Sequence, residues 1–142
     1  MIYKMRLHND PFLAIKSNEK CIEMRLNDEK RKNIKKGDKI EFTNTINNSV
    51  FYVEVVEVYK YPTFEELYKN HNKIDLGYKE NETAAPEDML LYYSKEDIKK
   101  YGVLAISIKP DDYENEKVRR INNTIDIVNN VLGTDIEKIN NK

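Results

Sequence analysis

Cysteine, tryptophan and histidine are scarce in this chain of 142 residues, which has one Cys, no Trp and two His. The single cysteine, Cys21, cannot form an internal disulfide, which is typical of a protein from the reducing cytoplasm. The two histidines, His8 and His71, are far apart in the sequence, and no group of His, Cys and acidic residues has the spacing of a zinc site. We therefore expect neither a metal nor another cofactor.

Net charge and long apolar runs are also missing. The 24 Lys and Arg residues nearly balance the 25 Asp and Glu residues, so that the net charge is -1 and the pI about 6.2. This balance excludes a globally basic nucleic-acid-binding protein, and any phosphate contact must come from a local patch. No apolar run is long enough to cross a membrane, and the N-terminus lacks the features of a signal peptide. The sequence predicts a cytoplasmic protein without a membrane partner.

The chain has instead a series of short elements. Alternation of apolar and polar residues predicts strands at residues 2–7, 21–26 and 50–61, one that starts near Ile40, and one at 103–109. Capping residues and turn signals predict short helices at 9–17, 63–67, 86–93 and 94–102, and the aperiodic residues 70–85 form a long connection. This order predicts an α+β fold, a small and mostly antiparallel β-barrel with short flanking helices and a C-terminal helix.

Residues 110–142 differ in character and form a separate helical extension. Apolar residues recur there every three or four positions and so share one helix face: Val118, Ile121, Ile125, Val128 and Leu132. Gly133 is expected to end this helix. The stripe either packs on the preceding domain or forms the seam of a homodimer, and its short length favours packing.

One strand carries an unusual polar face. In "NEKCIEMRL" the side chains of Glu23 and Arg25 alternate with apolar ones, and Lys20 comes just before the strand. Such charges often form a surface salt bridge, which contributes about 0–1 kcal/mol. Here a short helix ends before Lys20, so that the side chains of Lys20, Glu23 and Arg25 can converge at the mouth of one cleft. A guanidinium matches phosphate or base edges, and a glutamate beside two cations stays ionised and can accept from a nucleobase amino group.

The same residues resemble the signature of the ASCH domain family, which is a glycine, any residue, Lys, two residues, Glu, any residue and Arg. Lys20, Glu23 and Arg25 match it, and Asn18 stands at the glycine position, where its side chain tolerates a left-handed conformation. The stretches "KKGDKIEF", "VEVVEVYKYPTFEEL" and "KYGVLAISI" extend the resemblance over residues 1–109. It implies a PUA-like β-barrel for these residues, with a cleft beside the first helix and the motif strand.

The resemblance implies two functions for this cleft. The first is binding of RNA, or of a modified nucleoside or nucleotide, by Lys20, Glu23 and Arg25. The alternative is hydrolysis of N4-acetylcytidine, because some ASCH proteins are amidohydrolases and others are ribonucleases. Lys20 would then be the catalytic lysine, and Glu82, or Glu80, the later glutamate. Glu23 stands where those hydrolases have threonine and would hold the lysine protonated, so the enzyme question stays open. A third interpretation is a scaffold that binds proteins through the terminal helix.

Two further groups are candidates for contacts with RNA. The basic stretch "EKRKNIKK" supplies five candidates for phosphate contacts: Lys30, Arg31, Lys32, Lys35 and Lys36. Such contacts carry no sequence information, and the alternative is a solvated loop interleaved with Glu29. Tyrosines are the second group, because one of them can stack on an unpaired base. Tyr92 and Tyr93 are adjacent on an expected helix, so at most one of them should face the cleft.

Overall fold

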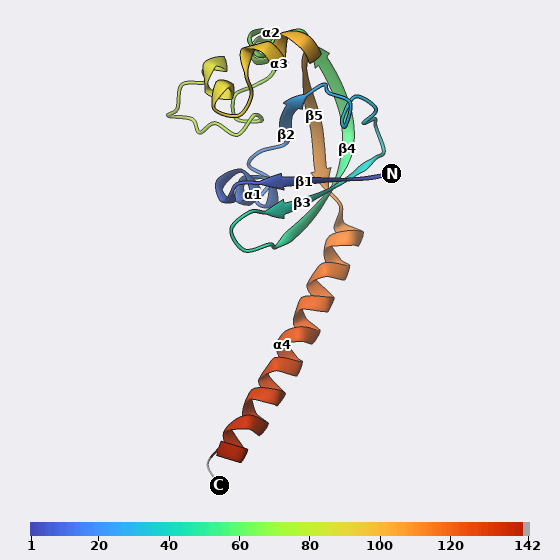
Figure 1. Cartoon of the computed structure of the whole chain (residues 1–142), viewed down its shortest axis with the longest axis vertical. Helices are drawn as coiled ribbons and strands as arrows, with labels where there is room; N and C mark the ends of the chain where they lie inside the picture. Colours follow the sequence, from blue (N-terminus) through green and yellow to red (C-terminus); the bar gives the residue numbers. More distant parts are fainter. Residues whose placement is uncertain (141–142) are drawn as a thin grey trace. The chain divides into compact units, whose positions relative to one another are not determined.

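The computed structural model describes the backbone of residues 1–140 and the side chains of residues 1–132. The elements in chain order (Figure 1) are β1 (Ile2–Leu7), α1 (Asn9–Lys16), β2 (Ile22–Leu26), β3 (Lys39–Asn44), β4 (Val50–Tyr61), α2 (Phe64–Asn70), η1 (Pro86–Leu91), α3 (Lys95–Tyr101), β5 (Val103–Pro110) and α4 (Asp112–Asn140). The chain divides into two compact units, residues 1–110 and 111–142.

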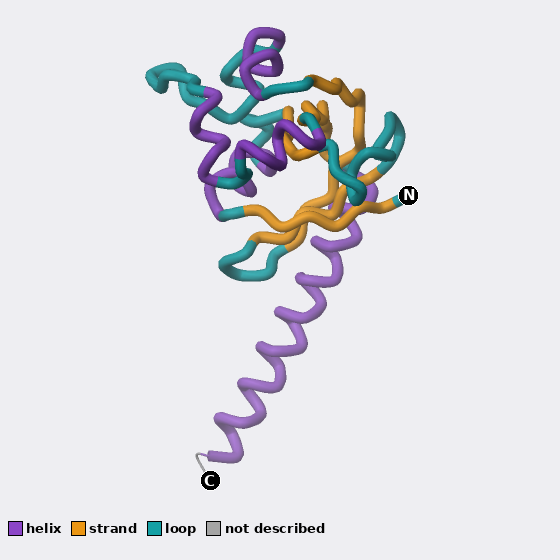
Figure 2. Tube along the Cα trace, turned by 45° about the horizontal axis from the view of Figure 1, so that its top comes forward, coloured by secondary structure: helices purple, strands orange, loops and turns teal. Residues whose placement is uncertain are grey.

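The first unit is built on one sheet of five strands in the order β1-β3-β4-β5-β2. The β1–β3 pair is parallel and the other three pairs are antiparallel, so the mostly antiparallel α+β fold is confirmed. The sheet curls into a half-barrel (Figure 2). The long strand β4 contributes to this curvature, since its pairing with β5 is irregular between Val55 and Glu57. The two edge strands of the sheet are β1 and β2.

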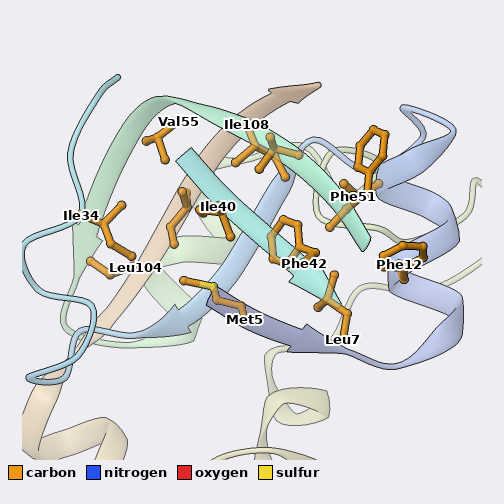
Figure 3. Packing of buried hydrophobic residues seen from close by; sticks show 13 residues of the cluster. Met5, Leu7, Phe12, Ile34, Ile40, Phe42, Phe51, Val55, Leu104 and Ile108 are labelled. Atoms are coloured by element: carbon orange, nitrogen blue, oxygen red, sulfur yellow. The ribbon is translucent and has the colours of Figure 1, made fainter. Parts of the chain in front are cut away.

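Alternation along the strands builds the interior of the half-barrel. In β4 the side chains of Phe51, Val53 and Val55 are buried, whereas the residues between them are partly exposed. These side chains pack with apolar residues of β1, β3 and β5 and with Phe12 of α1, which lies against the open side of the curled sheet (Figure 3). This cluster contains the side chains that a period of two predicts to face inward.

A second apolar cluster lies on the other face of β2 and β5. Phe64 and Leu67 of α2 and Met89 of η1 pack there against Val103 and Ala105 of β5. The neighbours of these two residues along β5, Leu104 and Ile106, belong to the interior cluster. The strand is therefore buried on both faces, as its uninterrupted apolar sequence predicts. Helices α2 and α3 gather near one end of β4 and β5 (Figure 1), and together with η1 they form a layer over this cluster.

Two helix predictions need correction. Residues 86–91 form a 3-10 helix rather than the start of an α-helix through residue 93. Gly133 does not end the terminal helix, because α4 continues to Asn140. A single glycine inside a helix costs only about 1 kcal/mol, so it does not have to stop one.

The second unit is α4 alone. Its residues Ile121, Ile125, Val128 and Leu132 are between 49% and 60% exposed. Both interpretations of this stripe, packing on the domain and pairing with a second copy, stay predictions. None of the helices in the described part of the chain combines the length and the apolar character needed to span a membrane.

Candidate functional site

The turn after α1 places Lys20 at the start of the motif strand. The amides of Glu19 and Lys20 both donate to the carbonyl of Ala14, at 2.9 and 3.0 Å, which closes the end of the helix. This turn requires a left-handed residue, and Asn18 supplies it with a φ of 64°. The expectation that asparagine replaces the signature glycine at a left-handed position is confirmed, because asparagine adopts this conformation at little cost.

The polar face of β2 does not point to solvent. Glu23 lies opposite Ile106 and Arg25 opposite Leu104 in the antiparallel pairing with β5. Residues opposite each other share a face of the sheet, and both partners belong to the interior cluster. Glu23 is accordingly only 4% exposed. The surface salt bridge that an isolated Glu-x-Arg pair suggests therefore does not describe this strand.

Lys20, Glu23 and Arg25 form a buried ion cluster, which we call the KER cluster. Lys20 Nζ lies 3.1 Å from Glu23 Oε1. Arg25 donates to Glu23 Oε2 from Nε at 3.1 Å and from an NH2 nitrogen at 2.9 Å. The amide of Met24 donates to Glu23 Oε1 at 3.2 Å. A carboxylate has about four acceptor directions, so Glu23 is saturated by two cations and one amide.

The contacts within the KER cluster favour the charged forms of Glu23 and Arg25. Burial alone would raise the pKa of Glu23, but the charges of Lys20 and Arg25 and their hydrogen bonds lower it below the usual range. Burial alone would lower the pKa of Arg25, and the charge of Glu23 raises it instead. Glu23 and Arg25 are thus each held in the charged form by their neighbours, although water is largely excluded.

Arg25 also joins the two edges of the sheet. The same nitrogen that contacts Glu23 donates to the carbonyl of Arg6 on β1, at 2.9 Å. Strands β1 and β2 are not neighbours in the sheet, so this bond crosses the seam of the half-barrel. Arg25 therefore fixes the geometry of the seam in addition to carrying charge.

The long connection holds the KER cluster from outside. The amides of Cys21 and Ile22 donate to the carbonyl of Asp75, at 3.1 and 2.9 Å. Gly77, with a φ of 106°, lies so close that an added Cβ would stand 2.9 Å from Cδ of Lys20. Residues 75–77 thus hold the start of β2 in place and confine the side chain of Lys20.

A cavity of about 690 Å³ opens beside the KER cluster. Its wall includes five of the charged residues that the sequence singled out: Lys20, Glu23, Arg25, Arg31 and Glu82. The other four basic candidates do not line it, namely Lys30, Lys32, Lys35 and Lys36. The cavity is bordered by β1, by the end of the β1–α1 turn, by β2 and by the connection that leads into η1, so it lies beside the first helix and the motif strand as expected.

Comparison with known proteins agrees with this architecture. The profile of the ASCH domain family matches residues 5–111. The chain belongs to the ASCH domain family. The hypothetical protein PH0355 is 32% identical, with a TM-score of 0.66, and the match covers 78% of this chain and 99% of that one. Protein PF0455 from Pyrococcus furiosus is also 32% identical, with a TM-score of 0.60 and coverage of 80% and 100%.

A more distant likeness supports the fold alone. A mutant of ZmASCH from Zymomonas mobilis is 14% identical, has a TM-score of 0.55, and aligns over 76% of this chain and 67% of its own. No curated protein matches the chain. The family assignment rests on the ASCH profile and on the two relatives at 32% identity, and it confirms the resemblance seen in the motif.

Glu82 reaches the cavity of this ASCH domain from an anchored loop. Lys73 Nζ donates to the carbonyls of Glu80 and Glu82, at 2.8 and 2.7 Å. The carboxylate Oε1 of Glu82 accepts from the amide of Lys79 at 2.8 Å. Glu80 does not line the cavity. Of the two glutamates that the resemblance left open, Glu82 is the one at the site.

The tyrosine prediction was wrong in one respect, because Tyr92 and Tyr93 both line the cavity. They follow the 3-10 helix instead of lying within an α-helix. Tyr93 stacks on Phe64, with ring centroids 6.1 Å apart and planes 16° apart. Tyr92 is 58% exposed, and its ring centroid lies 6.2 Å from that of His8.

Three polar residues at the cavity of the ASCH domain escaped the sequence reasoning: Arg6, Tyr68 and Asp88. Tyr68 shares a 2.8 Å hydrogen bond with Tyr78, whose hydroxyl donates to Asp88 Oδ2 at 2.8 Å. Burial and this pairing raise the pKa of Tyr68, so the charge at this wall resides on Asp88. Of these residues, only Arg6 could have been predicted from the sequence, because the alternation along β1 places its side chain on the outward face.

Within the described residues, no group of three or more His, Cys, Asp and Glu side chains is placed to hold a metal ion.

Proposed function

We propose that this ASCH domain binds a nucleobase, from RNA or from a modified nucleoside, in the cavity beside the KER cluster. The observation that carries the proposal is a cavity of about 690 Å³ whose lining includes the buried ions of the KER cluster and four tyrosines. Small-molecule sites usually have volumes of about 300–1,000 Å³, so the cavity has room for a base and its sugar.

The wall chemistry suits a flat heterocycle with donors and acceptors on its edge. Tyr92 and Tyr93 provide aromatic faces for stacking, which is the usual mode for an unpaired base. Arg25 is engaged by Glu23, by the carbonyl of Arg6 and by Tyr93, so a base carbonyl would be recognised by Arg25 and Tyr93 together. Asp88 accepts from Tyr78 through Oδ2, and Oδ1 has no hydrogen-bond partner within the described part of the chain.

Glu23 has a different part in this proposal from the one its sequence position suggests. All four of its acceptor directions are taken by Lys20, Arg25 and the amide of Met24. It therefore holds the two cations in place, and the acceptor for a base amino group is Asp88 or Glu82. Direct readout of a base by Glu23 stays a prediction.

Binding is tested by calorimetric titration with the four nucleosides, N4-acetylcytidine and a short single-stranded RNA. We expect saturable binding that Tyr92→Ala weakens roughly 5- to 150-fold, because stacking contributes about 1–3 kcal/mol per base. Tyr113→Ala is the matched control, since Tyr113 is similarly exposed but does not line the cavity. The absence of binding to every probe, or equal affinities for both variants, would refute the proposal.

Hydrolysis of an acylated cytidine is the second candidate, because Lys20 and Glu82 line the same cavity. In this reaction Glu82 takes a proton from water, the hydroxide adds to the acetyl carbonyl, and the Lys20 ammonium stabilises the oxyanion. The C–N bond then breaks, the amino group receives the proton, and acetate leaves. The Lys20 ammonium is already ion-paired with Glu23, so it serves as an electrostatic stabiliser rather than as a base.

The hydrolase is tested with N4-acetylcytidine by chromatography for cytidine. Activity that Glu82→Gln abolishes and Glu80→Gln retains would support the assignment, because only the first carboxylate lines the cavity. No cytidine at high enzyme concentration would remove this candidate and leave the binding function.

A further inference from the structure

We propose that the cavity contains a phosphate subsite made by Arg6 and Arg31 on either side of Arg25, so that the ligand is a nucleotide rather than a free nucleoside. This inference rests on the proposed binding of a nucleobase in the same cavity. Arg6 is new in this proposal, because it belongs neither to the ASCH signature nor to the basic loop.

Two of the three arginines have donors to spare. Arg6 is exposed, and its guanidinium has neither a hydrogen bond nor an ion pair within the part of the chain that the structure describes. Arg31 donates from Nη1 to Asp28 Oδ2 at 2.7 Å, which leaves Nε and Nη2 without an acceptor among the described residues. Arg25 is already engaged by Glu23, by the carbonyl of Arg6 and by Tyr93. A phosphate group presents acceptor oxygens in the geometry that guanidinium groups match.

Arg25 connects the other two arginines in space. Its guanidinium donates to the main-chain carbonyl of Arg6, at 2.9 Å. On the other side, Tyr93 lies within reach of the charges of both Arg25 and Arg31: burial raises the pKa of its phenol, and the two guanidinium groups counteract this rise. All four residues line the cavity. The three arginines therefore contribute to the lining of one cavity.

The charge balance of the cavity leaves this stretch in need of an anion. Four cations line the cavity, namely Arg6, Lys20, Arg25 and Arg31, and so do three carboxylates, Glu23, Glu82 and Asp88. Glu23 and Asp28 are ion-paired with these cations and offset two of the four charges, which leaves an excess of two positive charges near the arginines. A phosphate monoester carries a charge of about -1.5 to -2 at pH 7 and matches that excess. The whole protein has a net charge of -1, so this local excess is not a consequence of a basic composition.

The opposite wall fixes the orientation of such a ligand. Asp88 and Glu82 line the cavity on the side of η1 and the connection. These carboxylates repel a phosphate and accept from a base amino group, so the phosphate points to the arginines and the base amino group to Asp88 or Glu82. A neutral nucleoside would leave the guanidinium of Arg6 without a partner among the described residues.

The neighbouring lysines of the basic loop offer matched controls. Lys36 is exposed and carries the same charge as Arg31, but it does not line the cavity. Lys32 is already paired with Glu29 at 2.7 Å. A general electrostatic attraction of RNA to the loop would depend on these lysines as much as on Arg31, whereas the proposed subsite would not.

The test is a calorimetric titration of the full chain with each of the four nucleosides, the corresponding 5′-monophosphates, inorganic phosphate and a short single-stranded RNA. We expect the preferred monophosphate to bind at least tenfold more tightly than its nucleoside. Arg6→Gln and Arg31→Gln should each reduce this preference at least fivefold, with unchanged affinity for the nucleoside, while Lys36→Gln should leave both affinities unchanged. The Arg6 side chain makes no hydrogen bond or ion pair within the described residues, so Arg6→Gln reports on the subsite even if Arg31→Gln impairs folding.

The outcomes separate the two proposals. Nucleoside binding without any gain from the phosphate, or a gain that both arginine variants retain, overturns the phosphate subsite and leaves the nucleobase function intact. Failure of every nucleoside, nucleotide and RNA to bind overturns both. A tighter complex with RNA than with the monophosphate identifies an internal phosphodiester as the natural group, and the reverse order identifies a terminal monoester; both outcomes support the subsite.

Discussion

Replacement of Glu23 by glutamine is the sharpest test of the KER cluster. Glutamine has nearly the same shape as glutamate but no charge, so Glu23→Gln leaves Lys20 and Arg25 buried without a counter-ion. The Lys20 and Arg25 side chains are only 9% and 13% exposed, so solvent cannot compensate for the loss. Removal of one partner from a buried ion pair typically destabilises a protein by about 3–5 kcal/mol.

The expected change is large enough for thermal unfolding followed by circular dichroism. In a domain of this size 1 kcal/mol corresponds to a shift of about 4 °C in Tm, so Glu23→Gln should lower Tm by roughly 12–20 °C. Urea unfolding should show a lower midpoint with an unchanged m-value if the native fold is kept.

The exposed pair of Glu29 and Lys32 provides an internal control. It has the same residue types, also three positions apart, and its 2.7 Å separation is shorter than the 3.1 Å between Lys20 and Glu23. Its side chains are 77% and 46% exposed, so Glu29→Gln should cost only about 0–1 kcal/mol. If both variants unfold at the same temperature, or if Glu29→Gln is the less stable one, burial does not govern the strength of these pairs and the reasoning fails.

Three further predictions follow from the same site. The pKa of Glu23 is lowered in the folded protein, so its contribution to stability is complete above the ordinary pKa of 4.5. This contribution is lost as the pH falls through the lower folded pKa. Urea midpoints measured below pH 4.5 should therefore drop more steeply for the wild type than for Glu23→Gln. Gly77→Ala should shift the Nζ resonance of Lys20, because the added Cβ would stand 2.9 Å from its Cδ, whereas Gly37→Ala, which also has a positive φ but no neighbour within 4 Å, should leave that resonance unchanged. Burial and Asp75 raise the pKa of Cys21 to about 11, so alkylation at pH 8 should be roughly 100-fold slower than for a thiol at the model value of 9.0; alkylation at the rate of a free thiol would contradict the burial of its sulfur.

The strands were predictable because their signals are local. The alternation in residues 50–61 places Phe51, Val53 and Val55 on one face whatever the rest of the chain does, and all three are buried in the interior cluster. Asn18 was predictable for a similar reason, since the left-handed conformation at the end of α1 depends on its immediate neighbours. Local rules also indicated the convergence of Lys20, Glu23 and Arg25.

The burial of the motif was not predictable, because it depends on the curl of the sheet. Alternation distinguishes the face of Glu23 from the face of Met24, but it does not say that the polar face lies at the seam between β1 and β2. Only the approach of Arg6 across that seam gives Arg25 its third hydrogen bond. The same limit applies to the basic loop, where the amide of Lys32 donates to the carbonyl of Asp28 and the turn brings Arg31, but not Lys32, to the cavity.

The carboxylate at position 23 links the stability of this protein to the chemistry it can perform. The hydrolases that the signature resembles have a threonine at this position. A threonine hydroxyl could donate or accept a hydrogen bond, but it would leave Lys20 without a counter-ion. Glu23 instead holds Lys20 and Arg25 in fixed positions with full charge, and its lowered pKa keeps it from taking part in proton transfer near neutral pH. Such a wall is suited to recognise charge in a ligand, and it leaves Glu82 as the one signature-related residue free to act as a base. The proposed hydrolysis therefore depends on Glu82, which the loop anchored by Lys73 holds at the cavity, whereas the proposed binding depends on the fixed KER cluster.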